Sequence, residues 1–255
     1  MKIARFSTGA DPRYGILDGD ELVVLRGDPM FSGFDTTEER LPLADVKLLA
    51  PVIPRSKVIA VGRNYRDRAA ETGSEVPAEP MLFFKPNTSV IGPGDPIVLP
   101  RQSKEVHYEG ELAIVIGRLC KDVPLERVSE VVLGYTVAND VTARDLQRSD
   151  GQWARAKGFD TFCPVGPYLV TDLDATDLHL TTRVNGTTVQ DGRTSQLVHD
   201  IPAIVAYVSA AFTLLPGDLI LTGTPAGVGP IVAGDRVEVE VEGIGTLSNP
   251  VVSRD

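Results

Sequence analysis

The stretch V-H-Y-E-G-E-L-A-I-V-I-G, residues 106–117, places two glutamates directly against an apolar run. The run, residues 112–116, has the length and the β-branched content of a buried strand. Residues two apart lie on one face of a strand, so Glu109 and Glu111 should point the same way, at the edge of a core. Two carboxylates there repel each other and lose hydration unless a positive group lies between them. The alternative is a solvated strand face, where most such pairs lie.

A third carboxylate ends another apolar stretch, V-V-L-G-Y-T-V-A-N-D, at Asp140. If Asp140 converges with Glu109 and Glu111, the three form an anionic cluster of oxygen ligands. Such a cluster suits Mg²⁺, Mn²⁺ or Ca²⁺, with waters or substrate completing the coordination shell. It does not suit zinc, because the chain has only three histidines and none at ligand spacing. His107 shares the glutamates' face, and we expect it to pack beside the site without ligating a metal.

Polar side chains follow Asp140 at helical spacing. Arg144 and Gln147 come four and seven residues later, which predicts one face of a helix that begins at Asp140. Arg144 could pair with a carboxylate of the substrate or of a neighbour, and an ordinary helix salt bridge is the alternative. Lys157, in W-A-R-A-K-G-F-D, is an isolated lysine, a pattern that by itself favours a solvated surface position.

The glycine-rich stretch G-T-P-A-G-V-G, residues 223–229, invites comparison with a phosphate-binding loop. It lacks the G-K-[ST] ending of such a loop, and no helical pattern follows it. We therefore expect a tight connection after a strand, in which backbone amides and Thr224 are exposed. A turn of this kind could bind a carboxylate.

The rest of the chain is rich in strand patterns. Residues 1–50 are short apolar-alternating runs, with a hairpin signal at D-G-D, and two prolines in L-L-A-P-V-I-P-R-S place a domain boundary near residue 54. Strands are expected at 57–61 and 81–84, and one helix at 201–215, with Asp200 as its cap. In the last third of the chain, apolar and polar residues alternate with period two. These patterns predict an α+β, β-rich fold, with a small N-terminal β domain (1–54) and a larger domain (55–255) built as a roll or sandwich.

Composition restricts the partners of the protein. The 255 residues include 35 acidic and 25 basic ones, which gives a net charge of −10, and no Lys/Arg block suggests binding to nucleic acid or to an anionic membrane. No apolar run approaches the roughly 20 residues that span a bilayer, and no secretory signal is visible. The two cysteines show no metal or redox spacing, so a cytoplasmic protein with reduced thiols is expected.

Six stretches in this order resemble the fumarylacetoacetate hydrolase superfamily, in particular its branch of 2-hydroxyhepta-2,4-diene-1,7-dioate isomerases and acylpyruvases. They are G-R-N-Y-R-D-R-A-A-E-T-G (62–73), F-F-K-P (83–86), H-Y-E-G-E-L-A-I-V-I-G (107–117), G-Y-T-V-A-N-D-V-T-A-R-D-L-Q (134–147), A-K-G-F-D (156–160) and T-G-T-P-A-G-V-G (222–229). The resemblance implies a mixed β-sandwich roll preceded by a small domain, and a homodimer. It also implies a divalent cation, Mg²⁺ or Mn²⁺ before Ca²⁺, held by Glu109, Glu111 and Asp140.

The resemblance further implies a reaction class, since this superfamily acts on 2-oxo acids and their enols. A metal chelated by the substrate's carboxylate and 2-oxo oxygen stabilises an enolate, which C–C cleavage, decarboxylation and keto–enol isomerisation share. Lys157 would stabilise developing negative charge or move a proton. Gln147 and Thr224 match positions that contact substrate, and Lys85 of F-F-K-P lies near them in the superfamily, so the resemblance implies that Lys85 binds substrate as well.

One motif departs from the family pattern. Hydrolytic members carry N-Y-x-x-H-x-x-E, whose His–Glu dyad activates water, whereas this chain has Arg68 and Glu71 at the matching positions. Arginine stays protonated and cannot serve as a general base. On a helix capped by Asn64 and ended by Gly73, Arg68 and Glu71 would be neighbours and would pair. Arg68 could instead hold a second substrate carboxylate, or lie exposed on a loop.

Three functions remain open at the level of sequence. The first is a metal-dependent isomerase or decarboxylase of a 2-oxo or 2-hydroxy-enoic dicarboxylate in aromatic-compound catabolism, because neither reaction needs an activated water. The second is a hydrolase of acylpyruvate- or fumarylpyruvate-type substrates, with Glu71 alone as the base. The third is a metal-binding protein that has lost catalysis together with the histidine.

Overall fold

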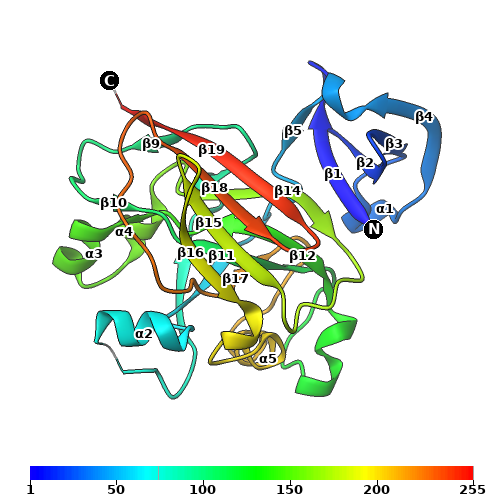
Figure 1. Ribbon diagram of the computed structural model, residues 1–255. Coiled ribbons are helices and arrows are strands. Elements are labelled where there is room, and N and C mark those ends of the chain that lie inside the picture. The colour runs from blue at the N-terminus through cyan, green and yellow to red at the C-terminus, as the bar shows by residue number, and fades with distance from the viewer. Residues whose placement is uncertain (74, 255) are drawn as a thin grey trace.

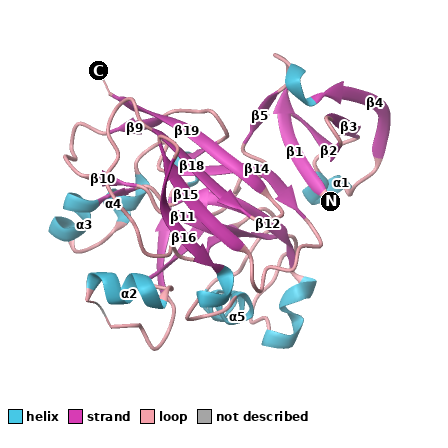
Figure 2. Ribbon diagram, viewed as in Figure 1, coloured by secondary structure: helices cyan, strands magenta, loops and turns pink. Residues whose placement is uncertain are grey.

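The structure is a computed structural model that describes residues 1–73 and 75–254. Two sheets form most of it (Figures 1 and 2). In the described part of the chain, the larger sheet has 12 strands, ten of them in the order β4-β3-β2-β1-β14-β12-β11-β17-β6-β7, and the smaller has five, in the order β16-β15-β18-β19-β9. The strand-rich fold expected from the sequence is confirmed.

The elements have the following bounds. The strands of the first half are β1 Lys2–Ser7, β2 Arg13–Asp18, β3 Glu21–Leu25, β4 Thr36–Pro42, β5 Lys47–Leu49, β6 Val58–Gly62, β7 Met81–Lys85, β8 Val90–Ile91, β9 Ile97–Leu99, β10 Val106–His107 and β11 Gly110–Ile116. Those of the second half are β12 Val132–Asn139, β13 Thr142–Ala143, β14 Cys163–Val170, β15 His179–Val184, β16 Thr187–Arg193, β17 Leu219–Leu221, β18 Arg236–Val241 and β19 Gly245–Ser253. The α-helices are α1 Pro29–Ser32, α2 Arg66–Thr72, α3 Arg144–Asp150, α4 Ala154–Gly158 and α5 Ile201–Ala211.

The main core lies between the two sheets. Strands β11, β12 and β14 of the larger sheet contact β15, β18 and β19 of the smaller one. Ile114 of β11, Leu180 of β15 and Val239 of β18 belong to one buried apolar cluster. Every residue of β11 is buried, which explains its unbroken apolar run: a strand covered on both faces has no solvated positions to alternate with.

The N-terminal strands continue the larger sheet (Figure 1, blue). Strand β1 pairs with β14 in antiparallel register, with Lys2 opposite Val170. The expected hairpin at D-G-D is present, since β2 ends at Asp18 and β3 begins at Glu21. Because β1 pairs with β14, the N-terminal strands share backbone hydrogen bonds with the sheet that carries β11 and β12.

Helix α5 is shorter than the sequence predicts. Its start is as expected, since the Asp200 side chain accepts a hydrogen bond from the Ala203 amide at 2.9 Å. It ends at Ala211 rather than at residue 215, and Phe212 is extended. Leu214 instead exchanges backbone hydrogen bonds with Cys120, at 2.9 and 3.0 Å. The prediction was wrong there because a long-range backbone pairing replaces the last helical turn.

Two other helix starts also differ from expectation. Helix α3 begins at Arg144 and not at Asp140, because residues 142–143 form β13 and pair with β10. Helix α2 begins after Tyr65, and the side chain of Asn64 does not cap it. Asn64 donates to the carbonyls of Thr222 and His199, at 2.8 and 3.0 Å, which joins the start of α2 to distant segments. The expected left-handed glycine at its end is confirmed, with φ of 60° at Gly73.

No helix of the described residues is long and apolar enough to cross a membrane.

Candidate metal centre and active site

Three carboxylates meet where β11 begins and β12 ends. Gly110 of β11 lies opposite Asn139 of β12, so the residues at these strand ends are neighbours. The Asp140 amide donates to the Glu109 carbonyl at 2.8 Å. Glu109, Glu111 and Asp140 are buried, and each offers an oxygen within 4.8 Å of the others. The antiparallel register thus brings together the three residues that the sequence suggested as metal ligands.

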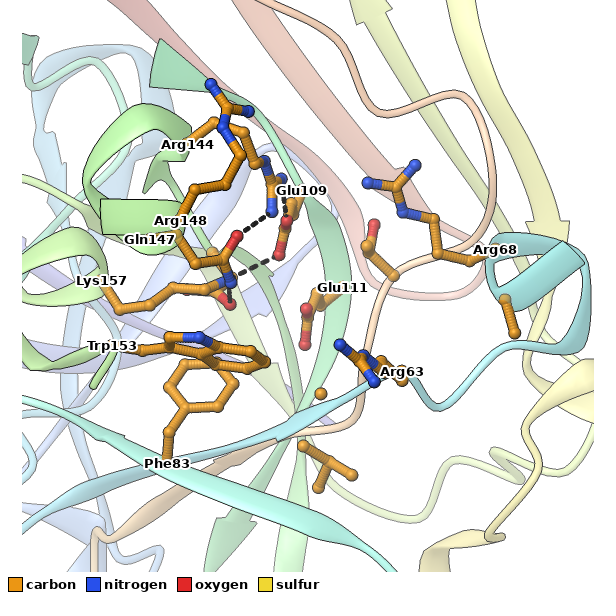
Figure 3. Close-up of a pocket in the computed structure, with 15 residues that line it drawn as sticks. Arg63, Arg68, Phe83, Glu109, Glu111, Arg144, Gln147, Arg148, Trp153 and Lys157 are labelled. Atoms are coloured by element: carbon orange, nitrogen blue, oxygen red, sulfur yellow. Dashed lines mark hydrogen bonds and ion pairs between the residues drawn. The ribbon is translucent and has the colours of Figure 1, made fainter. Parts of the chain in front are cut away.

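Lys157 supplies the positive charge between two of these carboxylates (Figure 3). Its ammonium lies 2.7 Å from Glu109 Oε2 and also contacts Asp140 Oδ2. Burial alone would lower the pKa of Lys157, but Asp140 and Glu109 outweigh it and raise the pKa above its ordinary value. Only 2% of Lys157 is exposed, so this lysine is not the surface residue that its isolated position in the sequence favours.

Arg144 contacts the outer side of Glu109. Its guanidinium pairs with Glu109 Oε1, and Gln147 accepts a second hydrogen bond from it at 2.6 Å. Burial alone would raise the pKa of Glu109, but Lys157 and Arg144 lower it below its usual range. Glu109 is therefore ionised. Of the two carboxylates that Arg144 could pair with, a substrate's or a neighbour's, the structure shows the neighbour's, that of Glu109.

Lys85 lies behind the site. Its ammonium is 2.6 Å from Asp140 Oδ1 and 2.5 Å from the Lys157 carbonyl, and 1% of the residue is exposed. It is not among the described residues that line the pocket. In this structure Lys85 therefore fixes Asp140 and the end of α4. It does not make the contact with substrate that the sequence resemblance implied.

Glu111 differs from the other two carboxylates. Its Oε2 accepts a hydrogen bond from the Gly223 amide at 2.7 Å, and the described residues give it no ion pair. Burial, followed by the charges of Asp140 and Glu109, raises its pKa well above the ordinary value. A carboxylate in such a place binds either a proton or a cation. The oxygen donors, their burial and the lack of a cationic partner for Glu111 among the described residues fit a divalent metal ion.

The carboxylates face a pocket of about 390 Å³. Four arginines line it among the described residues, namely Arg63, Arg68, Arg144 and Arg148. Trp153 and Phe83 form an aromatic wall, with ring centroids 5.3 Å apart, and the Lys157 ammonium lies 4.8 Å from the centre of the Phe83 ring. Many cationic groups around an acidic centre suit a small substrate with more than one carboxylate.

Four residues that line the pocket were not predicted from the sequence, namely Arg63, Phe83, Arg148 and Trp153. Three of them do lie in stretches that contain predicted site residues or resemble the family, namely G-R-N-Y, F-F-K-P and W-A-R-A-K-G-F-D. Two further residues that support the site were also not predicted. Asn139 accepts from the Glu109 amide at 2.9 Å, and Gln190 accepts from the Gly110 amide at 3.0 Å. These two side chains fix the backbone between the glutamates, a role that no local sequence pattern signals.

The glycine-rich loop 223–229 binds carboxylates of the chain itself. Besides the Gly223 contact with Glu111, the Ala226 amide donates to Asp67 at 3.3 Å and the Gly227 amide donates to Glu71 at 3.1 Å. No helix follows the loop within residues 230–254, as expected. Thr224 lines the pocket and donates to the Gly110 carbonyl at 2.8 Å while accepting from Gln190. Its hydroxyl therefore already donates one hydrogen bond and accepts another within the protein.

Arg68 and Glu71 lie together on α2. They form an ion pair, as the helical spacing predicted. Arg68 lines the pocket, whereas Glu71 is not among the described lining residues and 39% of its side chain is exposed. Helix α2 contributes no histidine at this place, so the base that activates water in hydrolytic members of the superfamily has no counterpart there.

Comparisons with known proteins agree with this geometry. Residues 57–252 match the family model "Fumarylacetoacetate (FAA) hydrolase C-terminal", and residues 1–51 match "Rv2993c-like, N-terminal". Protein Rv2993c of Mycobacterium tuberculosis is 61% identical over 231 residues, which cover 89% of this chain and 85% of that protein. The mitochondrial oxaloacetate tautomerase fahd2 of Xenopus laevis is 45% identical, over 87% of this chain and 73% of its own.

Solved structures show the same fold over full length. The 5-carboxymethyl-2-hydroxymuconate delta-isomerase of Mycobacterium smegmatis has a TM-score of 0.93 at 54% identity, covering 100% of both chains. The 2-hydroxyhepta-2,4-diene-1,7-dioate isomerase of Mycobacterium marinum has a TM-score of 0.92 at 51% identity, covering 100% of this chain and 99% of its own. The maleylpyruvate hydrolase of Sphingobium sp. SYK-6, solved with manganese(II) and pyruvate, has a TM-score of 0.83 at 35% identity and 100% coverage of both. The chain therefore belongs to the fumarylacetoacetate hydrolase family.

Proposed function

We propose that the protein is a divalent-metal-dependent enzyme that isomerises or decarboxylates a 2-oxo or 2-hydroxy-enoic dicarboxylate through an enolate. One observation carries the proposal: three buried carboxylates converge at the base of a pocket lined by arginines. The named relatives include two isomerases and an oxaloacetate tautomerase, and by their names all three act on 2-oxo or 2-hydroxy-enoic acids with two or three carboxylates.

Glu109, Glu111 and Asp140 would hold the cation, and Mg²⁺ or Mn²⁺ suits their oxygen donors. When bound, a divalent cation polarises a 2-oxo group and stabilises negative charge on its oxygen. The likeness to a hydrolase solved with manganese(II) supports a divalent cation in this fold.

Lys157 and Gln147 would act on the substrate directly. The Lys157 ammonium is charged in this setting and lines the pocket, so it can donate a hydrogen bond to an enolate oxygen or return a proton to it. Gln147 lines the same pocket and would orient the bound acid through its amide, whereas Thr224, which also lines the pocket, would do so only by releasing its hydrogen bond to the Gly110 carbonyl. In isomerisation the C3 proton would leave to water, and in decarboxylation CO₂ would leave. In both cases the electron pair of the broken bond would move toward the 2-oxo oxygen, where the Lys157 ammonium would stabilise the resulting charge.

The alternative is a C–C hydrolase, and Glu71 is the observation that favours it. Its carboxylate lies beside the pocket residue Arg68, and a family hydrolase is among the similar structures. Arg68 weakens this alternative, because its guanidinium already occupies a carboxylate oxygen of Glu71 that a water molecule would have to approach. Isomerisation and decarboxylation need no activated water and so do not depend on the missing histidine.

A proton NMR time course tests the proposal. Purified protein is incubated with oxaloacetate and, separately, with an acylpyruvate, each with Mg²⁺ and with a chelator. We expect chelator-sensitive enol–keto exchange or CO₂ loss from oxaloacetate, with the acylpyruvate left intact. Chelator-sensitive cleavage of the acylpyruvate would establish the hydrolase instead, and tight Mg²⁺ binding without any turnover would indicate a protein that has lost catalysis.

A further inference from the structure

Arg63 has an unusual backbone for an arginine. Strand β6 ends at Gly62, and the next residue turns the chain with φ of 57°, in the left-handed region. A side chain there costs about 1–2 kcal/mol relative to right-handed backbone, and glycine is the residue that avoids this cost. The turn is imposed by its neighbours, since Asn64 donates to two carbonyls and accepts from the His199 amide at 2.8 Å.

The side chain of Arg63 lies on the pocket wall. It is exposed and lines the same cavity as the carboxylate triad. In Figure 3 its guanidinium points into the pocket toward the side of Glu111, while Lys157 and Trp153 reach in from the opposite side. Strained residues kept at a site are often there for their side chains, and here the side chain faces the place where substrate would lie.

Arg63 also differs from the other pocket arginines in its contacts. Arg144 pairs with Glu109, Arg148 with Glu105, and Arg68 with Glu71. Within residues 1–73 and 75–254, no hydrogen bond, ion pair or ring contact involves the Arg63 side chain. A guanidinium offers five N–H donors that match a carboxylate in bidentate geometry, and those of Arg63 remain available to a ligand.

We infer that Arg63 is the receptor for the second carboxylate of the substrate, the one that does not bind at the carboxylate triad, and so selects dicarboxylates over monocarboxylates. This inference rests on the proposed function, because it assumes that the 2-oxo acid end of the substrate lies at the triad. It assigns to Arg63 the role that the sequence suggested for Arg68.

The test compares two ligands that differ only at the remote end. Malate and 2-hydroxybutanoate have four carbons and the same 2-hydroxy acid head, but malate ends in a carboxylate and 2-hydroxybutanoate in a methyl group. Trp153 is the only tryptophan of the chain and lines the pocket, so its fluorescence reports binding to the Mg²⁺-loaded protein. We expect malate to bind about tenfold or more tightly than 2-hydroxybutanoate.

Arg63→Gly should abolish this preference without harming the fold. Malate affinity should fall about tenfold or more, the affinity for 2-hydroxybutanoate should change less than about twofold, and the thermal midpoint should hold or rise because glycine accepts the left-handed backbone. Arg63→Lys should keep part of the preference. A preference that survives Arg63→Gly, or wild-type protein with no preference, would overturn the inference.

Arg66→Gln is the matched control, because Arg66 is exposed, three residues away, and not among the lining residues. It removes the same charge and should leave the preference unchanged; an equal loss in both variants would indicate a general charge effect and refute the role of Arg63. Oxaloacetate turnover by the wild-type protein is scored separately. If the protein prefers malate through Arg63 but does not turn over oxaloacetate, only the proposed function is contradicted. If it turns over oxaloacetate but shows no Arg63-dependent preference, only this inference is contradicted.

Discussion

Glu111 is the residue whose surroundings depend most on a bound cation. Lys157 contacts Glu109 and Asp140, whereas Glu111 receives one backbone hydrogen bond from Gly223 and lies close to both other carboxylates. A buried anion beside two others raises the free energy of the metal-free protein. A divalent ion would remove this cost, so metal binding and folding stability should be linked through this one side chain.

Glu111→Gln should therefore abolish stabilisation by Mg²⁺. In the wild-type protein, Mg²⁺ at 100 times its Kd should add about 2.7 kcal/mol to the free energy of unfolding, and the variant should gain almost none. The metal-free variant should be at least as stable as the metal-free wild type, because a neutral amide can accept the Gly223 hydrogen bond without the repulsion. Thermal unfolding with Mg²⁺ and with chelator measures both effects. Glu130→Gln, on an exposed residue, should respond to Mg²⁺ as wild type does.

The same side chain predicts a pH dependence. Burial and the charges of Asp140 and Glu109 raise the pKa of Glu111 well above 4.5. In the metal-free protein its contribution to stability is therefore fully present below about pH 4.5 and is lost as the pH rises through the raised pKa. Mg²⁺ binds the ionised form, so the Mg²⁺-induced rise in thermal midpoint should be larger at about pH 8 than at about pH 5.5. An equal rise at both pH values would contradict the assignment.

Among the individual residues of the site, the sequence predicted the three carboxylates but not most of the side chains around them. The period of a strand is enough to place Glu109 and Glu111 on one face. Burial of Lys157 and the nearness of Arg63 and Trp153 depend on which strands pair over long range. Strand β17 pairs with both β11 and β6, and only this pairing brings the end of β6 next to the triad.

Helix α4 is the element that carries Lys157, and Lys85 holds its end. The ammonium of Lys85 contacts Asp140 and the carbonyl of Lys157. Since the three groups are buried together, the positions of the helix end and of the Asp140 side chain depend on the same lysine. Lys85 is thus a positioning residue in this structure, with a role in stability that should be measurable without substrate.

Lys85→Met should lower the free energy of unfolding by about 3 kcal/mol, because it leaves Asp140 and the end of α4 short of one buried partner. Urea unfolding of metal-free protein gives this value directly. Lys104→Met is the control, since Lys104 is exposed and should change stability by no more than about 0.5 kcal/mol. A loss below about 1 kcal/mol for Lys85→Met would show that Lys157 alone neutralises Asp140.

Helix α2 separates the two candidate reactions. Glu71→Gln removes the only carboxylate at the family's dyad positions, so any hydrolysis of an acylpyruvate should fall by about 100-fold or more. Oxaloacetate enolisation or decarboxylation should stay within about tenfold of wild type, because neither needs an activated water. The NMR assay used for the wild type measures both, and Glu79→Gln, also exposed, is the matched control. Equal collapse of the oxaloacetate reaction would mean that Glu71 moves its proton.

The ends of the helices show where local sequence signals stop being sufficient. The cap at Asp200 and the left-handed Gly73 are local features, and both predictions are confirmed. The end of α5 and the start of α3 are set by backbone pairing with Cys120 and with β10, which lie far away in the chain. Propensity and spacing carry no information about such partners, so these two predictions were wrong.

At the scale of the whole molecule, the N-terminal strands share a core with the rest. Ile3, Leu25 and Val52 pack in one buried cluster with Val115 of β11 and Leu219 of β17. The sequence placed a boundary near residue 54 because two prolines lie there, but prolines do not report which apolar side chains meet after folding. The homodimer implied by the resemblance concerns the same scale and stays a prediction.

The shared cluster predicts that the full chain unfolds as one unit. Losing β1 would expose the edge of β14 and the apolar side chains under it, so the N-terminal strands should not melt before the larger sheet. Scanning calorimetry of the metal-free chain should show a single transition with equal calorimetric and van't Hoff enthalpies. A chain that begins at residue 55 should melt at a lower temperature or aggregate through the exposed edge. Two resolved transitions, or an unchanged midpoint in the shortened chain, would mean that residues 1–54 fold as an independent domain.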